Sequence, residues 1–299
     1  MVDMELADIA VDGLVSTAEA AVIGVDPNSL RRRLRAGEIH RLIPGWYAVR
    51  SPDGDADRHA LRTRAVLRHL GDRVQASHHS AVLLHGLPTW RADLATVHVC
   101  RREDRQSRRG NGLSVHPSVG DFPGSVLPPA IAVLQAGMLA GPEAALVSAD
   151  AALHRKRVTA DDLAGAAEVL RRQPGMAAVR AVLPFADGRH ESPGETRLAF
   201  LLRGLRVKAT PQVWVRDGRS SWRVDFLLDD APVVLEFDGL VKYQDGSRGA
   251  EVLVAEKLRE DSLRGLGYEV VRVVWADLAD PARLLRRIEQ AIARARRAA

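Results

Sequence analysis

The chain has 299 residues, which is enough for two or three domains with hydrophobic cores. Its composition, 46% hydrophobic and 27% charged, indicates a globular protein and excludes a disordered one. The 43 basic residues exceed the 38 acidic ones, which favours a polyanionic partner, and a single cysteine, Cys100, excludes an intramolecular disulfide. The N-terminus lacks an apolar core, and prolines interrupt the apolar stretch 126–147. We therefore expect no secretion signal, no membrane partner and a cytoplasmic location.

Residues 13–50 have the pattern of a small winged helix-turn-helix. A capping-box sequence at residues 16–19 predicts the start of a short helix. Residues 26–36 begin with Asp-Pro, an N-cap followed by a proline at the first helical position, and predict a second helix. Apolar segments on both sides of the Pro-Gly pair at residues 44–45 predict a β-hairpin, the wing.

The second helix carries polar side chains that suit contact with DNA, while Leu30 and Leu34 form an i, i+4 pair that faces the other helix. An arginine-rich recognition helix beside a wing enters the major groove and contacts phosphates. The alternative is an ordinary solvated basic face. The candidate DNA-contacting residues are Asn28, Arg31, Arg32, Arg35 and, on the wing, Arg41.

Two segments carry a resemblance to a known family. Residues 37–48, Gly-Glu-Ile-His-Arg-Leu-Ile-Pro-Gly-Trp-Tyr-Ala, resemble the N-terminal domain of AbiEi-family antitoxins. Residues 77–88, Ser-His-His-Ser-Ala-Val-Leu-Leu-His-Gly-Leu-Pro, resemble the segment that follows the wing in AbiEi-like proteins. The resemblance implies a DNA-binding regulatory module at the N-terminus.

After a polar linker at residues 51–57, the chain continues into a middle region of mixed α and β character. Strands are predicted at 96–101 and 113–117, with a basic, glycine-containing loop at 106–112 between them. Helices are predicted at 58–70, 76–86, 129–140, 142–154, 159–172 and 174–183. Thr159 is the expected N-cap of its helix.

The spacing of the histidines and arginines in this middle region does not indicate a specific kind of site. His78, His79 and His85 contain no i, i+4 pair, and no cysteine lies close to them in the sequence. We therefore interpret them as hydrogen-bonding residues at a helix start and not as a zinc site. A basic cluster could lie on nucleic acid or be solvated, and the sequence favours neither. Its members are Arg101, Arg102, Arg105, Arg108 and Arg109.

The C-terminal region has the predicted element order helix, three strands, helix, strand, followed by a basic helix from Pro281. The strands are expected at 211–216, 222–229, 232–238 and 269–275, and the helices at 193–203 and 251–265. Glu195 stands three residues after Ser192. This capping-box spacing predicts that its carboxylate reaches back to the helix start.

Three carboxylates interrupt the apolar hairpin of this region. Glu236 and Asp238 share one face of the second strand, because side chains alternate along a strand. With a two-residue turn at 230–231, Asp225 lies opposite Glu236. The β-carbons of such cross-strand neighbours are about 5 Å apart, and like charges at that distance oppose folding. A divalent cation would offset the repulsion, and Mg²⁺ binds through one or two carboxylates with water and phosphate. Alternatively, Asp225 caps a strand end and the other acids face solvent.

The motifs of this region resemble the Vsr-like branch of the PD-(D/E)XK nuclease superfamily, in the version found in actinobacterial proteins with an upstream AbiEi-type region. They are Val-Asp-Phe, Glu-Phe-Asp-Gly, Lys-Tyr, Glu-Lys-Leu-Arg-Glu-Asp and Val-Val-Arg-Val-Val-Trp, within residues 190–280. The resemblance implies that Asp225, Glu236 and the main-chain carbonyl of Phe237 hold Mg²⁺ or Mn²⁺, with Asp238 as a further ligand. It also implies that a glutamate on the leading helix, here Glu195, lies near the metal.

One position departs from the superfamily pattern. The lysine expected two residues after the glutamate is Asp238 here. Lys242 or Lys257 would then supply the positive charge, and sequence reasoning does not separate them. For Lys257 the alternative is an ion pair with Asp261 on an exposed helix face.

Together these patterns predict an α+β multidomain protein. The expected domains are a winged helix-turn-helix at 1–54, a mixed α/β middle domain at 55–187 and a restriction-endonuclease-like αβββαβ core at 188–299. The expected function is metal-dependent hydrolysis of double-stranded DNA, delivered by the N-terminal domain. The alternative is a non-enzymatic, antitoxin-like regulator with an inactive nuclease fold. The sequence is compatible with a homodimer, and it identifies no toxin partner.

Overall fold

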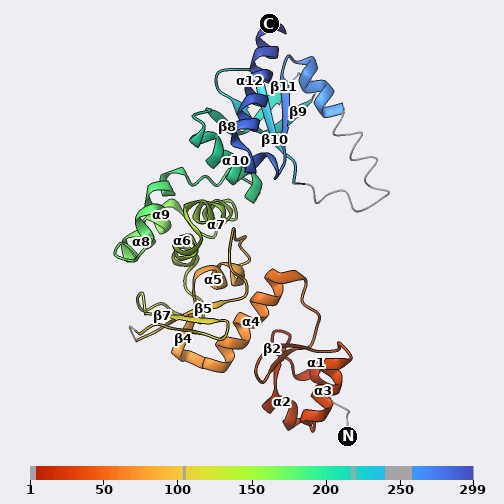
Figure 1. The fold of residues 1–299 in the computed structure, drawn as a ribbon, viewed down its shortest axis with the longest axis vertical. Helices are drawn as coiled ribbons and strands as arrows, with labels where there is room; N and C mark the ends of the chain where they lie inside the picture. Colours follow the sequence, from red (N-terminus) through yellow and green to blue (C-terminus); the bar gives the residue numbers. More distant parts are fainter. Residues whose placement is uncertain (1–4, 104–105, 217, 219, 240–257, 299) are drawn as a thin grey trace. The chain divides into compact units, whose positions relative to one another are not determined.

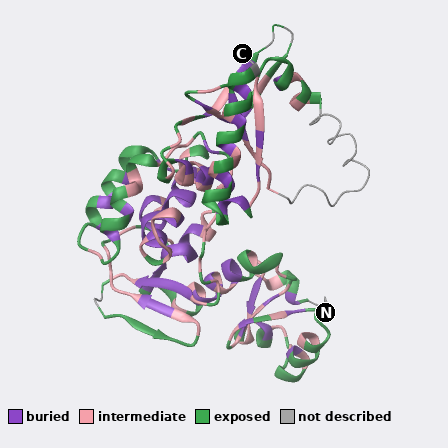
Figure 2. Cartoon of the chain, turned by 45° about the horizontal axis from the view of Figure 1, so that its top comes forward, coloured by how far each residue is buried: buried purple, intermediate pink, exposed green. Residues whose placement is uncertain are grey.

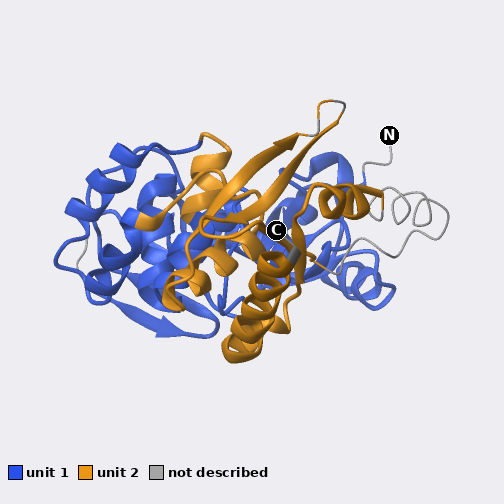
Figure 3. Cartoon of the chain, turned by 90° about the horizontal axis from the view of Figure 1, so that it is seen from above, with its two compact units in different colours: residues 1–148, 157–184 blue, residues 149–156, 185–299 orange. Residues whose placement is uncertain are grey.

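The computed structural model of the chain describes residues 5–103, 106–216, 218, 220–239 and 258–298 (Figure 1). The chain forms two compact units (Figure 3): unit 1 comprises residues 1–148 and 157–184, and unit 2 comprises residues 149–156 and 185–299. Both mix helices and strands, as predicted for an α+β multidomain protein. The division into three domains stays a prediction. Each helix in the described residues is too short or too polar to span a lipid bilayer.

Unit 1 begins with the element order predicted for a winged helix-turn-helix. The elements are α1 (Leu6–Ile9), β1 (Leu14–Ser16), α2 (Thr17–Val22), α3 (Pro27–Arg35), β2 (His40–Ile43) and β3 (Trp46–Ala48). Ser16 and Glu19 form the predicted capping box of α2, and Asp26 caps α3. The hairpin β2–β3 is the predicted wing, and β1 adds a third antiparallel strand to it, in the order β1-β3-β2.

Apolar contacts connect this N-terminal part to the next helix. Leu30 of α3 is buried in a cluster with Ala20 of α2, and Leu34 packs against the same cluster, so the pair faces the other helix as predicted. On the other side of the small sheet, Trp46 packs with residues of α4 (Gly54–Leu70). The guanidinium of Arg68 on α4 lies 4.7 Å from the centre of the Trp46 ring and forms an ion pair with Glu19.

The middle of unit 1 contains a four-stranded sheet with the order β4-β5-β7-β6. Its strands are β4 (Val74–Ala76), β5 (Val97–Arg101), β6 (Arg108–Gly110) and β7 (Leu113–His116). Strands β5 and β7 are parallel, whereas the other pairs are antiparallel. Two predictions were wrong here. The helix expected from residue 76 begins at His78 because β4 precedes it, and the loop expected at 106–112 contains β6, which pairs with β7.

Helices α5 (His78–Leu84), α6 (Pro129–Ala140), α8 (Ala160–Val169) and α9 (Met176–Val182) complete unit 1. Helix α7 (Pro142–His154) lies in unit 1 through Ser148 and in unit 2 beyond it. Helix α6 is buried along most of its length, and Figure 2 shows buried residues concentrated in such helices and in the strands. Thr159 forms a capping box with Asp162 at the start of α8, which confirms the predicted N-cap.

Unit 2 contains a second four-stranded sheet, in the order β11-β10-β9-β8, between helices. Its elements are α10 (Pro193–Gly204), β8 (Ala209–Arg216), β9 (Ser221–Leu228), β10 (Val233–Phe237), a helix over residues 258–265, β11 (Glu269–Val273) and α12 (Pro281–Ala298). Strands β8, β9 and β10 are antiparallel neighbours, and β11 is parallel to β10. The predicted order of helix, three strands, helix, strand and helix is therefore present.

The two faces of this second sheet pack against different helices. Leu235 and Phe237 of β10 lie in a cluster with residues of α10 and α12. Val234 lies in another cluster with Leu263, from the helix at 258–265. The alternation along β10 confirms that Glu236 is on the opposite face from Leu235 and Phe237.

Candidate functional site

The acidic residues singled out from the sequence line one cavity of unit 2. Glu195 lies in the first turn of α10, Asp225 on β9, Glu236 on β10 and Asp238 directly after β10. All four line a cavity of about 420 Å³. The recorded pairing of β9 and β10 ends at Phe226 and Leu235, so Asp225 and Glu236 are the next residues beyond the last pair, and their direct cross-strand pairing stays a prediction.

The environment of Asp225 disfavours its charged form. The carboxylate accepts a hydrogen bond from the main-chain N–H of Phe237 at 2.8 Å, which anchors it to the neighbouring strand. Burial, together with the nearby charges of Glu195 and Glu236, raises the pKa of Asp225 to about 6. A cation beside this carboxylate would stabilise its ionised form.

A guanidinium already lies in the cavity. Arg259, on the helix at 258–265, contacts Glu236 at 2.5 Å and donates to the carbonyl of Arg223 at 2.7 Å. Lys242 and Lys257, the cations expected from the sequence, lie outside the described residues. Sequence reasoning missed Arg259, although it stands two residues after Lys257 in the Glu-Lys-Leu-Arg-Glu-Asp motif.

Glu195 reaches back to the start of its helix, as its capping-box position predicts. Its buried carboxylate accepts from the main-chain N–H of Glu191 at 3.0 Å and from the Ser192 hydroxyl at 2.7 Å. It also accepts from the side-chain amide of Gln212 at 2.8 Å. Gln212, on β8, has a left-handed backbone with φ of 58°. Such strain is retained where the surrounding structure enforces it, and the sequence contained no signal for this residue.

Asp238 and Phe237 complete the wall of the cavity. The main-chain N–H of Asp238 donates to the carbonyl of Val273 at 2.8 Å. The carboxylate of Asp238 lies 3.9 Å from the guanidinium of Arg272 on β11. The ring of Phe237 packs against Gly194, where a β-carbon would come within 2.0 Å of the ring. The roles of the Phe237 carbonyl and of Asp238 as metal ligands stay predictions.

The donor set fits a hard divalent cation. Asp225 and Glu236 come from adjacent strands and line the same cavity, and Mg²⁺ commonly takes one or two carboxylates with water and phosphate. Among the described residues, the ligand atoms that come together in threes within 4.8 Å are histidine nitrogens of unit 1 and not these carboxylates. A cation at Asp225 and Glu236 would therefore have to take its remaining ligands from water and phosphate.

The predicted DNA-contacting residues form an exposed group in unit 1. Asn28, Arg31, Arg32 and Arg35 on α3 and Arg41 on β2 are all exposed. Arg31 donates to the side-chain oxygen of Asn28 at 2.8 Å, so these two side chains are held together on the surface of α3. The hydrogen bond leaves their remaining polar groups toward solvent, where a phosphate or a base edge can reach them.

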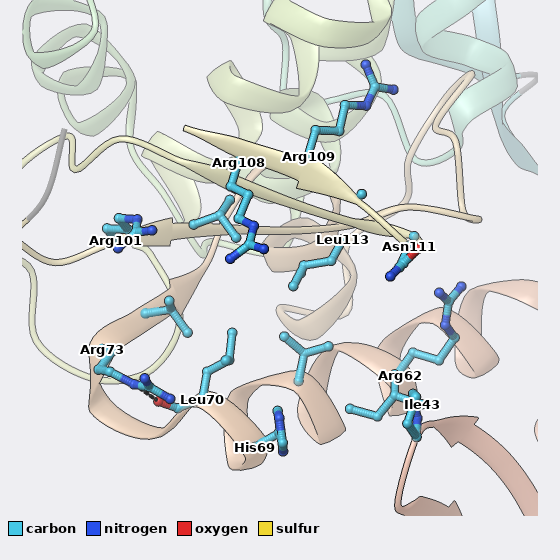
Figure 4. A pocket seen from close by; sticks show the side chains of 16 residues that line it. Ile43, Arg62, His69, Leu70, Arg73, Arg101, Arg108, Arg109, Asn111 and Leu113 are labelled. Atoms are coloured by element: carbon cyan, nitrogen blue, oxygen red, sulfur yellow. Dashed lines mark hydrogen bonds between the residues drawn. The ribbon is translucent and has the colours of Figure 1, made fainter. Parts of the chain in front are cut away.

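A second basic feature of unit 1 is a cavity of about 640 Å³ between α4 and the strands β6 and β7 (Figure 4). Five arginines line it: Arg62, Arg73, Arg101, Arg108 and Arg109. In Figure 4, Arg108 extends toward α4, whereas Arg109 extends from the opposite side of β6. The predicted basic cluster is thus divided: Arg102 instead donates to the carbonyl of Phe122 at 2.9 Å, and Arg105 lies outside the described residues.

The histidines that were interpreted as hydrogen-bonding residues do make such bonds. His79 donates to the carbonyl of Thr96 at 3.2 Å, and His85 to that of Leu127 at 2.8 Å. Nδ1 of His78 lies 3.0 Å from the Ser77 hydroxyl. The sequence did not predict that His98 and His116 lie beside His78. Burial lowers the pKa of His98 to about 3 and of His116 to about 4, so both rings are neutral at pH 7.

The chain is similar to known proteins in two ways that bear on its function. Residues 4–50 match the family model of the AbiEi antitoxin transcriptional regulators. The chain is 30% identical over 275 residues to two uncharacterized proteins of Mycobacterium tuberculosis, MT2308 of strain CDC 1551 and Rv2248 of strain H37Rv. The alignments cover 89% of this chain and 97% of each relative.

A solved structure, that of the RV2827C protein from Mycobacterium tuberculosis, matches with a TM-score of 0.36 and 15% identity. The match covers 68% of this chain and 83% of that one. Likeness at this level carries no argument about fold or function. The family match confirms the predicted AbiEi-type N-terminal region, and the nuclease resemblance of the C-terminal region stays a prediction.

Proposed function

The chain belongs to the family of the Mycobacterium tuberculosis protein Rv2248 and carries an AbiEi antitoxin-type DNA-binding regulator region at residues 4–50, and on this premise we propose that it binds and cuts double-stranded DNA. One observation carries the nuclease part of the proposal. Asp225 on β9 and Glu236 on β10 line one cavity together with Glu195.

The carboxylates of Asp225 and Glu236 would hold Mg²⁺ or Mn²⁺, with Asp238 and the Phe237 carbonyl as further oxygen donors. When bound, the metal would lower the pKa of an attacking water and stabilise charge on the scissile phosphate. Asp225 is anchored by the Phe237 N–H, so its oxygens keep one orientation. Glu195, which is held by Ser192 and Gln212, adds negative charge to the same wall.

Two arginines of the cavity take the role expected of the superfamily lysine. Arg259 and Arg272 line the cavity, Arg259 beside Glu236 and Arg272 near Asp238. Planar guanidinium groups suit two-point contact with a phosphate, so they would position the DNA backbone against the carboxylates. Lys242 and Lys257 keep their predicted role as alternatives.

Cleavage assays with the full-length protein test the nuclease part. Supercoiled plasmid should be nicked or linearised with Mg²⁺ or Mn²⁺, and Asp225→Asn and Glu236→Gln should each reduce the rate by about 10²-fold or more, because each removes a charged donor from the site. Asp230→Asn is the matched control, since Asp230 is an exposed carboxylate in the turn of the same hairpin. Equal residual cleavage by wild type and both variants would indicate a contaminating nuclease and refute the proposal.

Delivery to DNA is assigned to α3 and the wing. Arg31 and Arg35 are exposed on α3 and would contact phosphates or bases in the major groove. Arg31→Ala with Arg35→Ala should weaken band-shift binding of duplex DNA by about tenfold or more, since each phosphate or base contact is worth about 1 kcal/mol or more. Arg171→Ala with Arg172→Ala removes the same charge from exposed positions after α8 and should leave binding unchanged. An equal loss of DNA binding in both double variants would show that the effect comes from net charge and not from contacts made by α3.

A second candidate function is an antitoxin-like regulator that does not cut DNA. The ion pair between Arg259 and Glu236 favours it, because a guanidinium that neutralises Glu236 competes with a metal for the same oxygens. Asp238 at the position of the superfamily lysine favours it as well. Binding that survives EDTA and depends on Arg31 and Arg35, without cleavage of any duplex in Mg²⁺ or Mn²⁺, would establish this function instead.

A further inference from the structure

Three histidines from distant parts of the sequence converge in unit 1. His78 begins α5, His98 lies on β5 and His116 ends β7. Each can offer one ring nitrogen such that the three nitrogens lie within 4.8 Å of one another. His78 and His98 are buried and His116 is half-buried. Three imidazole nitrogens directed at one point form the ligand set of a transition-metal site.

The sheet brings two of the three rings together. Strands β5 and β7 are parallel, and their register pairs His98 with Ser114 and Cys100 with His116. Residues two apart on a strand point to the same face, so His98 and His116 lie on one face of the sheet. Nδ1 of His98 lies 2.8 Å from Nε2 of His116.

The third ring is positioned by a strained backbone. His78 has φ of 51°, in the left-handed region that non-glycine residues seldom adopt. Its main-chain N–H donates to the side-chain oxygen of Gln135, a buried residue of α6, at 3.1 Å. The ring centre of His78 consequently lies 4.0 Å from that of His116 and 5.3 Å from that of His98. Buried strain of this kind is typical of positions with a functional constraint.

We propose that His78, His98 and His116 bind a zinc-type divalent transition metal that ties α5 to strands β5 and β7. Zn–N bonds of about 2.0–2.1 Å in a tetrahedral site place ligand nitrogens about 3.3 Å apart. The His98–His116 pair, at 2.8 Å, would open slightly, and the more distant nitrogen would move inward. Binding would break the hydrogen bond between the His98 and His116 nitrogens: the ring that donates it would carry its proton on the other ring nitrogen instead, so both ligands stay neutral imidazoles and no net proton is released.

The groups around the rings suit this role. Ser77 lies at Nδ1 of His78, so Nε2 is the nitrogen that would ligate, and a hydrogen bond at the other nitrogen is the usual way in which a ligating histidine is oriented. The Ser114 hydroxyl lies 3.2 Å from Nε2 of His116, so an oxygen stands beside a nitrogen that would ligate.

Cobalt titration of the full-length protein tests the site. The background is Asp225→Asn with Glu236→Gln, which removes the carboxylate donors of unit 2. After dialysis against a chelator, this protein should bind one equivalent of Co²⁺ with the visible ligand-field bands of a tetrahedral nitrogen site. His98→Asn and His116→Gln should each abolish the bands. His85→Gln, which changes a half-buried histidine outside the cluster, should keep them.

The proposal would be overturned if the background protein showed no such absorption bands with Co²⁺, or if the bands persisted in both histidine variants. If circular dichroism shows that a variant does not fold, X-ray absorption spectroscopy of the zinc-loaded background protein tests the site instead. Three imidazole ligands support the site, whereas oxygen ligands alone refute it. Zinc should also raise the melting temperature of the background protein and not that of a folded His116→Gln variant.

Discussion

The acidic cavity of unit 2 and the histidine cluster of unit 1 are built in opposite ways. Asp225 and Glu236 lie 11 positions apart, and one hairpin brings them to the same cavity. His78, His98 and His116 come from a helix and two strands of a sheet whose order is β4-β5-β7-β6. Local register therefore forms the first site, and tertiary packing forms the second.

The two sites also differ in the charge of their side chains. Repulsion between carboxylates on neighbouring strands is tolerated because a main-chain N–H and the Arg259 guanidinium stabilise them. The buried histidines remain neutral, because burial lowers the pKa of His98 and His116 far below 7. A site of charged oxygens suits hard cations, whereas a site of neutral nitrogens suits zinc-type metals.

The largest expected effect concerns the packing that shapes the acidic cavity. A β-carbon at Gly194 would lie 2.0 Å from the Phe237 ring, so Gly194→Ala must displace that ring or the start of α10. We expect the free energy of unfolding of unit 2 to fall by about 1–3 kcal/mol, the usual cost of overpacking. Hydrogen exchange of the β9 and β10 amides in the full-length protein measures it. Gly204→Ala, at the open C-terminal end of the same helix, should not destabilise. Equal effects at the two glycines would contradict the contact.

A smaller effect is expected in unit 1, at the residue that holds the His78 backbone. Gln135→Met keeps the side-chain volume but removes the oxygen that accepts from the His78 N–H. An unsatisfied buried N–H should lower the free energy of unfolding by about 1–2 kcal/mol. It should also weaken Co²⁺ binding, if the cluster binds metal. Urea denaturation of the full-length protein gives the first quantity. A variant as stable as wild type would show that the left-handed conformation of His78 does not depend on Gln135.

The most gradual effect is the pH dependence that Asp225 confers, because it is spread over about two pH units. Its pKa is raised to about 6 in the folded protein, against about 3.9 for an ordinary aspartate. The stabilisation from its protonated form is fully present below pH 4 and is lost as the pH rises through about 6. The slope between these values is at most about 1.4 kcal/mol per pH unit.

Denaturation at pH 4, 5 and 6 measures this slope in wild type, in Asp225→Asn and in the control Asp230→Asn. The slope should be smaller in Asp225→Asn and unchanged in Asp230→Asn. Mg²⁺ bound between Asp225 and Glu236 would also reduce it, because a cation stabilises the ionised carboxylate. An identical slope in all three proteins would show that Asp225 ionises as an exposed aspartate does.

Capping residues and strand alternation made much of the local structure predictable. Ser16, Asp26 and Thr159 each begin a helix where their side chains accept main-chain N–H groups. The faces of β10 also follow from alternation. The prediction failed for β6, since its exposed arginines and glycine have no strand pattern, and the strand exists only because β7 lies beside it.

The same division applies to the candidate sites. Asp225, Glu236 and Glu195 were identified from motifs and spacing, and the structure brings them into one cavity. Arg259 and Arg272 reach that cavity from two different elements, and Gln212 contacts Glu195 from a third, so spacing within one element could not indicate them. His98 and His116 were likewise missed, because each is an ordinary strand residue until the parallel register of β5 and β7 sets them on one face.

The sequence by itself determined the helix starts, the alternation of the strands, the AbiEi-type region at residues 4–50 and the position of Asp225 and Glu236 on neighbouring strands of one hairpin. These properties depend on neighbours within a few residues or across one turn. Only the tertiary structure decided which cations face the carboxylates and that three histidines share one point, because those contacts join segments that no short-range interaction relates.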